Sequence, residues 1–465
     1  MLNCNTTSKV HHIYNTVHFL PVLWRFHSKL PKLPTEGGVI VGCIDHTSGV
    51  SVLIEDDNIN ALIIGKSGVG KTKYYICPSI EYCCATGSSF IAADSVGKVL
   101  QTGTIAKEYY RYKLSVIDLR NPIYSNGYNI LYQVGKYMDL YKSDGKLEYR
   151  NKMVEYAKIT TKSILTSDGS IEEDTPLYKA IENLLTAIIL IISDYCTLEK
   201  RHILSVFSLL VDLFTPSDTL VWSRLRQLIN KLPSKHAARQ FLDTALDYSE
   251  QDVAKVIPDI VSKYYALIPA DFKPILGCDN SIDIERFCKG KSAIYLILPE
   301  KDTTNNFLAS LIVQQLYREM SLVATENGGT LNKRVMLYMD DMEKMPKING
   351  INDIFSATHT QNISIVAATQ SIEQLTEKYS EKTTSAIFKN IHCVMFGEII
   401  SNSSAKGQDP HRFLVQVDGK DPFITKFNLR FKWGIGLEED YIIEKELSHN
   451  IICTSVRELK NEMEK

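Results

Sequence analysis

The stretch ALIIGKSGVGKT, residues 61–72, determines how the rest of this chain is interpreted. Its first four residues form a continuous apolar run, which is typical of a strand that is buried on both faces of a parallel sheet. The residues that follow fit the pattern G-x-x-x-x-G-K-[ST], in which glycines let successive backbone amides point toward one phosphate group. The pattern predicts a phosphate-binding loop that consists of Gly65, Lys66, Ser67, Gly68, Val69, Gly70, Lys71 and Thr72.

The last two residues of the phosphate-binding loop have predicted chemical roles. Lys71 is expected to reach the β- and γ-phosphates of a nucleoside triphosphate, and Thr72 is expected to ligate Mg²⁺. A helix-length segment follows as far as about Cys84, and its N-terminus adds a positive dipole beside the phosphates. The sequence therefore predicts a nucleoside triphosphate and Mg²⁺ as the ligands of this loop.

Other apolar runs predict the rest of the sheet. Residues 89–93, which end at Asp94, and residues 114–118 are separated by a helix-length gap, which indicates right-handed βαβ units. The β-branched runs 39–42 and 50–54 predict a hairpin. Strand-like runs return at 293–298, 335–339, 363–368 and 393–396. The fold class is therefore α/β, with a central and mainly parallel sheet.

A long segment between the two groups of strands is predicted to be helical. At 174–176 the sequence Asp-Thr-Pro is a typical helix start, with an N-cap followed by proline in the first turn. The apolar run 184–192 is too short to cross a bilayer, which needs about 20 apolar residues, and it predicts a core helix. We divide the chain into an N-terminal arm (1–37), a nucleotide-binding domain (38–135 and 285–437), an all-α inserted domain (136–284) and a charged C-terminal tail (438–465).

Polar residues at the ends of two later strands are candidates for the chemistry. Asp340 ends an apolar strand and is placed to hold Mg²⁺ through water, and Asp341 stands where many ATPases have a glutamate that orients the attacking water. Gln370 follows the next strand and is placed to sense the γ-phosphate or to position water. The alternatives are a solvated acidic turn for the two aspartates, a polar helix start for Gln370, and an N-cap for Asp94. The predicted catalytic residues are Lys71, Asp340, Asp341 and Gln370, and the predicted metal ligands are Thr72 and Asp340.

Composition excludes several classes of protein. The 465 residues include 52 Lys and Arg against 54 Asp and Glu, so a uniformly basic nucleic-acid binder is excluded, while a local basic patch is not. Hydrophobic and charged residues make up 44% and 23%, which excludes a disordered chain and a polytopic membrane protein. The ten cysteines form no C-x-x-C pair and no cluster with zinc spacing, a pattern typical of reduced thiols in a cytosolic protein.

The order of these motifs resembles the VirD4/TraG family of conjugative coupling proteins, which are membrane-associated, DNA-translocating ATPases related to FtsK and HerA. The resemblance covers roughly 180 residues by motif. Besides the phosphate-binding loop, it rests on Ile76 and Pro78 after the loop, FIAADSVGKVL (90–100), LSVIDLRNPIYSNGYNIL (114–131), Asp-Asp-Met (340–342) and AATQSIEQL (367–375).

The resemblance implies a RecA-like P-loop NTPase domain with an inserted all-α domain, and hydrolysis of ATP. It also implies partners: DNA bound without regard to sequence, relaxase or relaxosome proteins, membrane-anchored type IV secretion components, and further copies of the chain, with a hexameric ring as the active form. Because no transmembrane segment is recognised in the sequence, we expect a cytoplasmic protein that lies at the inner face of the cell membrane.

Two departures from the family pattern keep a second hypothesis open. Asp341 replaces the family's glutamate, and His-Thr-Gln at 359–361 stands where the family often has a basic pair. These changes favour a nucleotide-binding adaptor that recruits a DNA–protein substrate and hydrolyses ATP weakly or not at all. A small-molecule kinase or GTPase is a third hypothesis, which the large helical insertion and the lack of an Asn-Lys-x-Asp signature disfavour.

Overall fold

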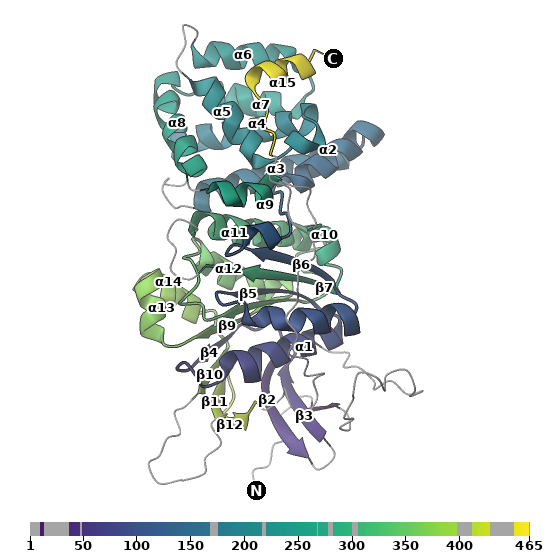
Figure 1. The fold of residues 1–465 in the computed structure, drawn as a ribbon, viewed down its shortest axis with the longest axis vertical. Coiled ribbons are helices and arrows are strands. Elements are labelled where there is room, and N and C mark those ends of the chain that lie inside the picture. The colour runs from purple at the N-terminus through teal and green to yellow at the C-terminus, as the bar shows by residue number, and fades with distance from the viewer. Residues whose placement is uncertain are drawn as a thin grey trace.

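The computed structural model describes residues 10–13, 37–46, 49–167, 175–215, 220–266, 268–277, 282–299, 306–397, 412–427 and 451–464. Within these residues the molecule is elongated, with a helical region at one end and the β-sheets toward the other (Figure 1). Most of the predicted arm, and the predicted tail before residue 451, lie outside the described residues.

The main sheet carries the candidate site. Its strands are β4 (Ala61–Ile64), β5 (Ser89–Asp94), β6 (Lys113–Asp118), β7 (Ser292–Ile297), β8 (Val335–Asp340), β9 (Ile363–Thr369), β10 (Cys393–Gly397), β11 (Arg412–Val417) and β12 (Phe423–Lys426). In the described part of the chain these nine strands are ordered β12-β11-β10-β4-β9-β8-β5-β7-β6. From β10 to β6 every neighbouring pair is parallel, whereas β11 and β12 are antiparallel additions at one edge. The predicted α/β fold with a mainly parallel sheet is confirmed.

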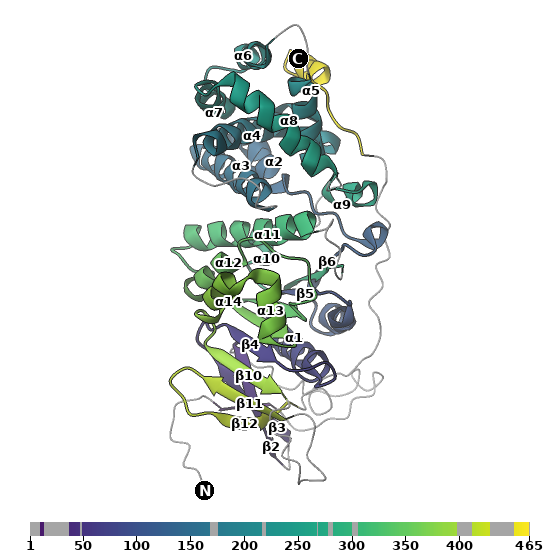
Figure 2. The same cartoon turned by 90° about the vertical axis from the view of Figure 1, so that its left-hand side faces the viewer.

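Helices cover both faces of the main sheet (Figure 2). One face is covered by α1 (Cys77–Thr86). The other face is covered by α10 (Ile284–Phe287), α11 (Asn306–Glu326), α12 (Ile351–Ala357), α13 (Ile372–Tyr379) and α14 (Glu381–Phe388). Successive strand residues point to opposite faces. Accordingly, Ile63 and Tyr338 belong to the apolar cluster with α1, and Leu62 and Leu337 to the cluster with α11. This two-sided burial explains why the strands are continuous apolar runs in the sequence.

A smaller antiparallel sheet adjoins the edge of the main one. It consists of β1 (Val10–Ile13), β2 (Val39–His46) and β3 (Gly49–Glu55) in the order β1-β3-β2. Strands β2 and β3 form the hairpin that the sequence predicts. The backbone N–H of Cys43 donates to Oγ1 of Thr425 in β12 at 3.0 Å, and Nη1 of Arg334 donates to the carbonyl of Gly37 at 2.6 Å. These bonds attach the hairpin to the main sheet.

The helical region comprises α2 (Tyr132–Asp144), α3 (Leu147–Ser167), α4 (Pro176–Tyr195), α5 (Ile203–Phe214), α6 (Val221–Lys231), α7 (Ala237–Leu246), α8 (Glu250–Ala266) and α9 (Lys273–Gly277). Helix α4 starts as predicted, because the Thr175 side chain accepts a hydrogen bond from the Tyr178 N–H just before Pro176. It is long and apolar enough to cross a membrane, but 72% of its most apolar 18-residue stretch is buried inside the protein. The prediction of a core helix is confirmed.

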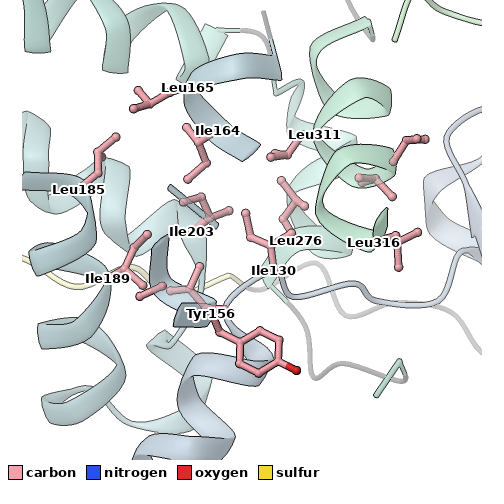
Figure 3. Packing of buried hydrophobic residues seen from close by; sticks show 14 of the residues in the cluster. Ile130, Tyr156, Ile164, Leu165, Leu185, Ile189, Ile203, Leu276, Leu311 and Leu316 are labelled. Carbon is pink, nitrogen blue, oxygen red and sulfur yellow. The ribbon is translucent and has the colours of Figure 1, made fainter. Parts of the chain in front are cut away.

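One apolar cluster joins the helical region to the main sheet. Figure 3 shows Ile164 and Tyr156 of α3 and Ile189 of α4 on one side, and Leu311 and Leu316 of α11 on the other. Because these residues share a buried cluster, the helical region packs directly on the helix that covers the sheet.

The end of the chain returns to the helical region. Helix α15 (Val456–Glu462), which is yellow in Figure 1, lies beside α4 and α5 and far from β12. The Val456 N–H donates to Asp212 Oδ2 at 2.8 Å, Leu459 is fully buried, and Lys200 pairs with Glu458 at 3.0 Å. The described part of the predicted tail is therefore packed on the inserted helices.

Candidate functional site

Four neighbouring strands end at one edge of the main sheet. The register pairs Ile64 of β4 with Thr369 of β9, and Asp94 of β5 with Asp340 of β8. The N–H of Gly65 donates to the carbonyl of Thr369 at 3.1 Å, so the phosphate-binding loop begins directly at this edge. Parallel strands have their carboxyl ends on the same side, and ligands of open α/β sheets bind there.

The phosphate-binding loop depends on two glycines with left-handed backbone conformations. Gly68 has φ +92° and Gly70 has φ +91°, a region that other residues adopt only with strain. A Cβ on Gly70 would lie 2.2 Å from Cδ2 of Tyr74. Residues 66–68 are exposed, whereas Val69 is buried beneath them. The top of the loop is therefore open, and its base is fixed.

The helix that follows the loop starts differently from the prediction. Lys71–Ile76 forms a π-helical turn, in which the Cys77 N–H bonds to the carbonyl of Thr72, five residues earlier. Pro78 has no N–H, and its ring disfavours an α-helical carbonyl four residues before it, which gives a physical reason for the wider turn. Such turns often occur at functional sites, and this one places Lys71 and Thr72 at the loop's exit.

Lys71 is buried and held by two oxygen atoms. Only 5% of its side chain is exposed; its Nζ donates to the carbonyl of Gly65 at 2.7 Å and lies 3.6 Å from Oδ1 of Asp341. Asp341 also pairs with Lys344 at 2.7 Å and has a left-handed φ of +51°. The charge of Asp341 is therefore shared between two lysines.

Thr72 and Asp340 come together although 268 residues separate them in the sequence. The Thr72 hydroxyl donates to Oδ2 of Asp340. Asp340 is 2% exposed, and its Oδ1 has no hydrogen-bond partner among the described residues. Burial raises the pKa of Asp340 to about 7, although the Thr72 hydroxyl opposes the shift. An orphaned carboxylate oxygen beside a hydroxyl is a donor set that suits Mg²⁺, so these residues fit the predicted metal.

The other predicted polar residues differ in their placement. Asp94 accepts hydrogen bonds from the backbone N–H groups of Val96 (2.8 Å) and Val99 (3.0 Å), so it fixes the turn after β5, although Gly97 is the N-cap residue of the short helix that follows. Gln370 directly follows β9 and is partly exposed at the same edge as the loop. The segment Thr358–Gln361 precedes β9 and therefore lies at the opposite edge of the sheet.

Two residues near this edge were missed in the sequence. Both carboxylate oxygens of Glu343 are buried and have no hydrogen-bond partner in the part of the chain that the structure describes. Nζ of Lys378, in α13, donates to the carbonyls of Glu343 (2.7 Å) and Met345, and burial lowers the pKa of Lys378 to about 8. The only sequence signal is that Glu343 is the third acidic residue in Asp-Asp-Met-Glu; Lys378 has none.

The fold and the loop at its edge define a mixed α/β protein of the P-loop type. The family described as type IV secretory system conjugative DNA transfer matches residues 32–406, most of the chain. This chain therefore belongs to that family of conjugative coupling proteins, and the resemblance to the VirD4/TraG family is confirmed. None of the curated protein sequences compared with it matches.

Several solved structures resemble this chain, and the first one described here has the same fold. The bacterial conjugative coupling protein TrwBdeltaN70, in its unbound monoclinic form, has a TM-score of 0.50 and 11% identity over 95% of this chain and 98% of that chain. The plasmid coupling protein TrwB in complex with ADP and Mg²⁺ has a TM-score of 0.43 and 12% identity over 98% and 97% of the two chains. VirB4 of Thermoanaerobacter pseudethanolicus has a TM-score of 0.37 and 10% identity over 85% and 97%.

Proposed function

We propose that this chain is an ATP-dependent motor that couples DNA, or a relaxosome, to a type IV secretion channel during conjugative transfer. The observation that supports the proposal is the contact between Thr72 and Asp340 beside an open phosphate-binding loop. It occurs in a chain of a conjugative DNA-transfer family.

Each residue of the site has a role in this proposal. Backbone N–H groups of residues 65–72 bind phosphate oxygens, and Lys71 leaves Asp341 to contact the β- and γ-phosphates. Thr72 and Asp340 would hold Mg²⁺, which would supply positive charge to offset the charge that develops on the phosphates. Gln370, at the end of the strand beside the loop, senses the γ-phosphate or positions water.

The partners follow from the family. DNA transfer requires contacts that ignore sequence, and such contacts are made mainly to phosphates, so DNA binding should weaken steeply as salt increases. We propose that the active form is a ring of copies of this chain, with a hexamer as the expected size. The ring acts at the inner face of the cell membrane, with relaxase and membrane-anchored secretion components as partners.

The adaptor hypothesis is the second candidate function. It is favoured by the engagement of Asp341 with two lysines and by the lack of arginine at 359–361. Measuring ATP turnover with and without single-stranded or duplex DNA separates the two. DNA-stimulated turnover supports the motor, and retained nucleotide affinity without stimulated turnover supports the adaptor.

A genetic experiment tests the motor in cells. Lys71→Ala should abolish DNA transfer while the protein is still produced at its normal level. Unchanged transfer by this variant would contradict the motor.

A further inference from the structure

The carboxylate that follows Asp340 is poorly placed to act on water. Asp341 lies 3.6 Å from Lys71 and 2.7 Å from Lys344. Its backbone has a left-handed φ of +51°. The pair with Lys344 remains when Lys71 leaves to contact phosphate, so one oxygen of Asp341 stays engaged, and Asp is also one methylene shorter than Glu.

Glu343 has the properties that Asp341 lacks. Both of its carboxylate oxygens are buried without a hydrogen-bond partner among the described residues. A buried, unpartnered acidic group is costly, so its persistence in a structure calls for a functional explanation. Burial raises the pKa of Glu343, and the Asp341 charge adds to the shift; the Thr369 side chain and the Lys71 charge lower it. Thr369 and Lys71 are parts of the candidate site, so Glu343 lies within its electrostatic reach.

The loop that carries Glu343 is fixed from two sides. The Met342 N–H donates to the carbonyl of Ala368 at 2.8 Å, which ties the loop to the end of β9. Lys378 donates to the carbonyl of Glu343 at 2.7 Å and also to that of Met345. The backbone of Glu343 is therefore held in place, whereas its carboxylate oxygens accept no hydrogen bond of normal geometry from the described residues, as expected of a group that acts on a ligand.

We propose that Glu343, and not Asp341, is the carboxylate that orients the attacking water, an assignment that rests on the proposed ATP hydrolysis. The oxygen of the water forms a bond to the γ-phosphorus, and the bond from that phosphorus to the β,γ-bridging oxygen breaks, with its electron pair leaving on ADP. The proton lost by the water passes to Glu343 and from there to solvent. Asp341 holds Lys71 in place when no nucleotide is bound.

The test compares purified Glu343→Gln, Glu343→Asp and Asp341→Asn with the wild type. Glu343→Gln keeps the size of the side chain and removes its charge, so kcat should fall at least 100-fold, while the Kd for ATP stays within threefold. Glu343→Asp keeps the charge but shortens the reach, so kcat should fall at least tenfold. Asp341→Asn should lower kcat less than tenfold and tighten ATP binding, because it frees Lys71.

The matched control is Glu377→Gln, the same chemical change at an exposed position of α13, which should leave kcat and Kd within twofold. Thermal unfolding of every variant separates loss of fold from loss of chemistry. If Glu343→Gln keeps more than a third of wild-type kcat, or if Asp341→Asn is the more damaging change, the assignment of Glu343 is wrong. If the wild type itself turns over ATP no faster than Lys71→Ala, the proposed function fails as well, and the two failures are thereby distinguished.

Discussion

Replacing Lys71 with alanine should weaken ATP binding far more than it weakens the fold. Lys71 is 5% exposed and pairs with Gly65 and Asp341. A charge-assisted contact to phosphate in a water-poor site contributes about 2–4 kcal/mol, which corresponds to a roughly 30- to 900-fold rise in Kd. The cost to folding should be about 1 kcal/mol, for the lost bond to Gly65, because Asp341 keeps Lys344 as a partner at 2.7 Å.

Two measurements check this prediction. Calorimetric titration with ATP and Mg²⁺ gives the Kd, and urea denaturation gives the free energy of unfolding. Lys73→Ala is the control, because it removes the same charge from an exposed position in the same turn and should change the Kd less than threefold. The reasoning is refuted if Lys71→Ala binds ATP within threefold of the wild type, or if its lost affinity is matched by a comparable loss of folding stability.

Three other substitutions test the fold around the site. Gly70→Ala should destabilise the protein by about 1–3 kcal/mol and weaken ATP binding, because φ is +91° and the new Cβ would lie 2.2 Å from Cδ2 of Tyr74. Urea denaturation checks this prediction, and an unchanged urea concentration at the unfolding midpoint contradicts it. Ile189→Ala removes a fully buried side chain of α4 and should lower the free energy of unfolding by about 2–5 kcal/mol, as measured by urea denaturation. A loss below about 1 kcal/mol would mean that α4 is not a core helix. Glu319→Gln should flatten the pH dependence of stability, as measured by urea denaturation between pH 5 and pH 9.

The sign of the Glu319 effect follows from its burial in α11. Burial raises the pKa of Glu319 to about 8; the Gln315 side chain opposes the shift, and the Asp283 and Glu285 charges add to it. In the unfolded chain a glutamate has a pKa of about 4.3, so between these values the folded state binds more protons than the unfolded state. Stability should therefore fall as pH rises from about 5 to about 8, by up to about 1.4 kcal/mol per pH unit. Equal slopes in Glu319→Gln and the wild type would contradict this account.

The central part of the fold was predictable because its strands are buried on both faces. Strands β4, β5, β8 and β9 are continuous apolar runs, and the glycine pattern after β4 has few conformations open to it. Strands β11 and β12 were missed. In β11 the buried residues Phe413, Val415 and Val417 alternate with more exposed ones, a period of two that predicts a half-buried edge strand. Helices α2 and α3 were not predicted individually, since their charged faces weaken the apolar signal.

The site was predictable in its parts more than in its connections. The spacing of the loop residues predicts roles for Lys71 and Thr72, but the sequence does not reveal that Asp341 pairs with Lys71. Nor does the sequence reveal the left-handed backbone conformation of Asp341. The unpartnered state of Glu343 likewise depends on which groups surround it after folding. Tertiary geometry thus decides which of three nearby carboxylates contacts a lysine or a hydroxyl, and which has no hydrogen-bond partner among the described residues.

The most direct test of the account is a crystal structure with a non-hydrolysable ATP analogue and Mn²⁺ in place of Mg²⁺, because Mn²⁺ is located by its anomalous scattering. The account predicts the triphosphate on the backbone N–H groups of residues 65–72. It places the metal in direct coordination with the Thr72 hydroxyl, with the Asp340 carboxylate bound to the metal directly or through one water. A nucleotide bound elsewhere, or a metal that contacts neither of these residues, would contradict it.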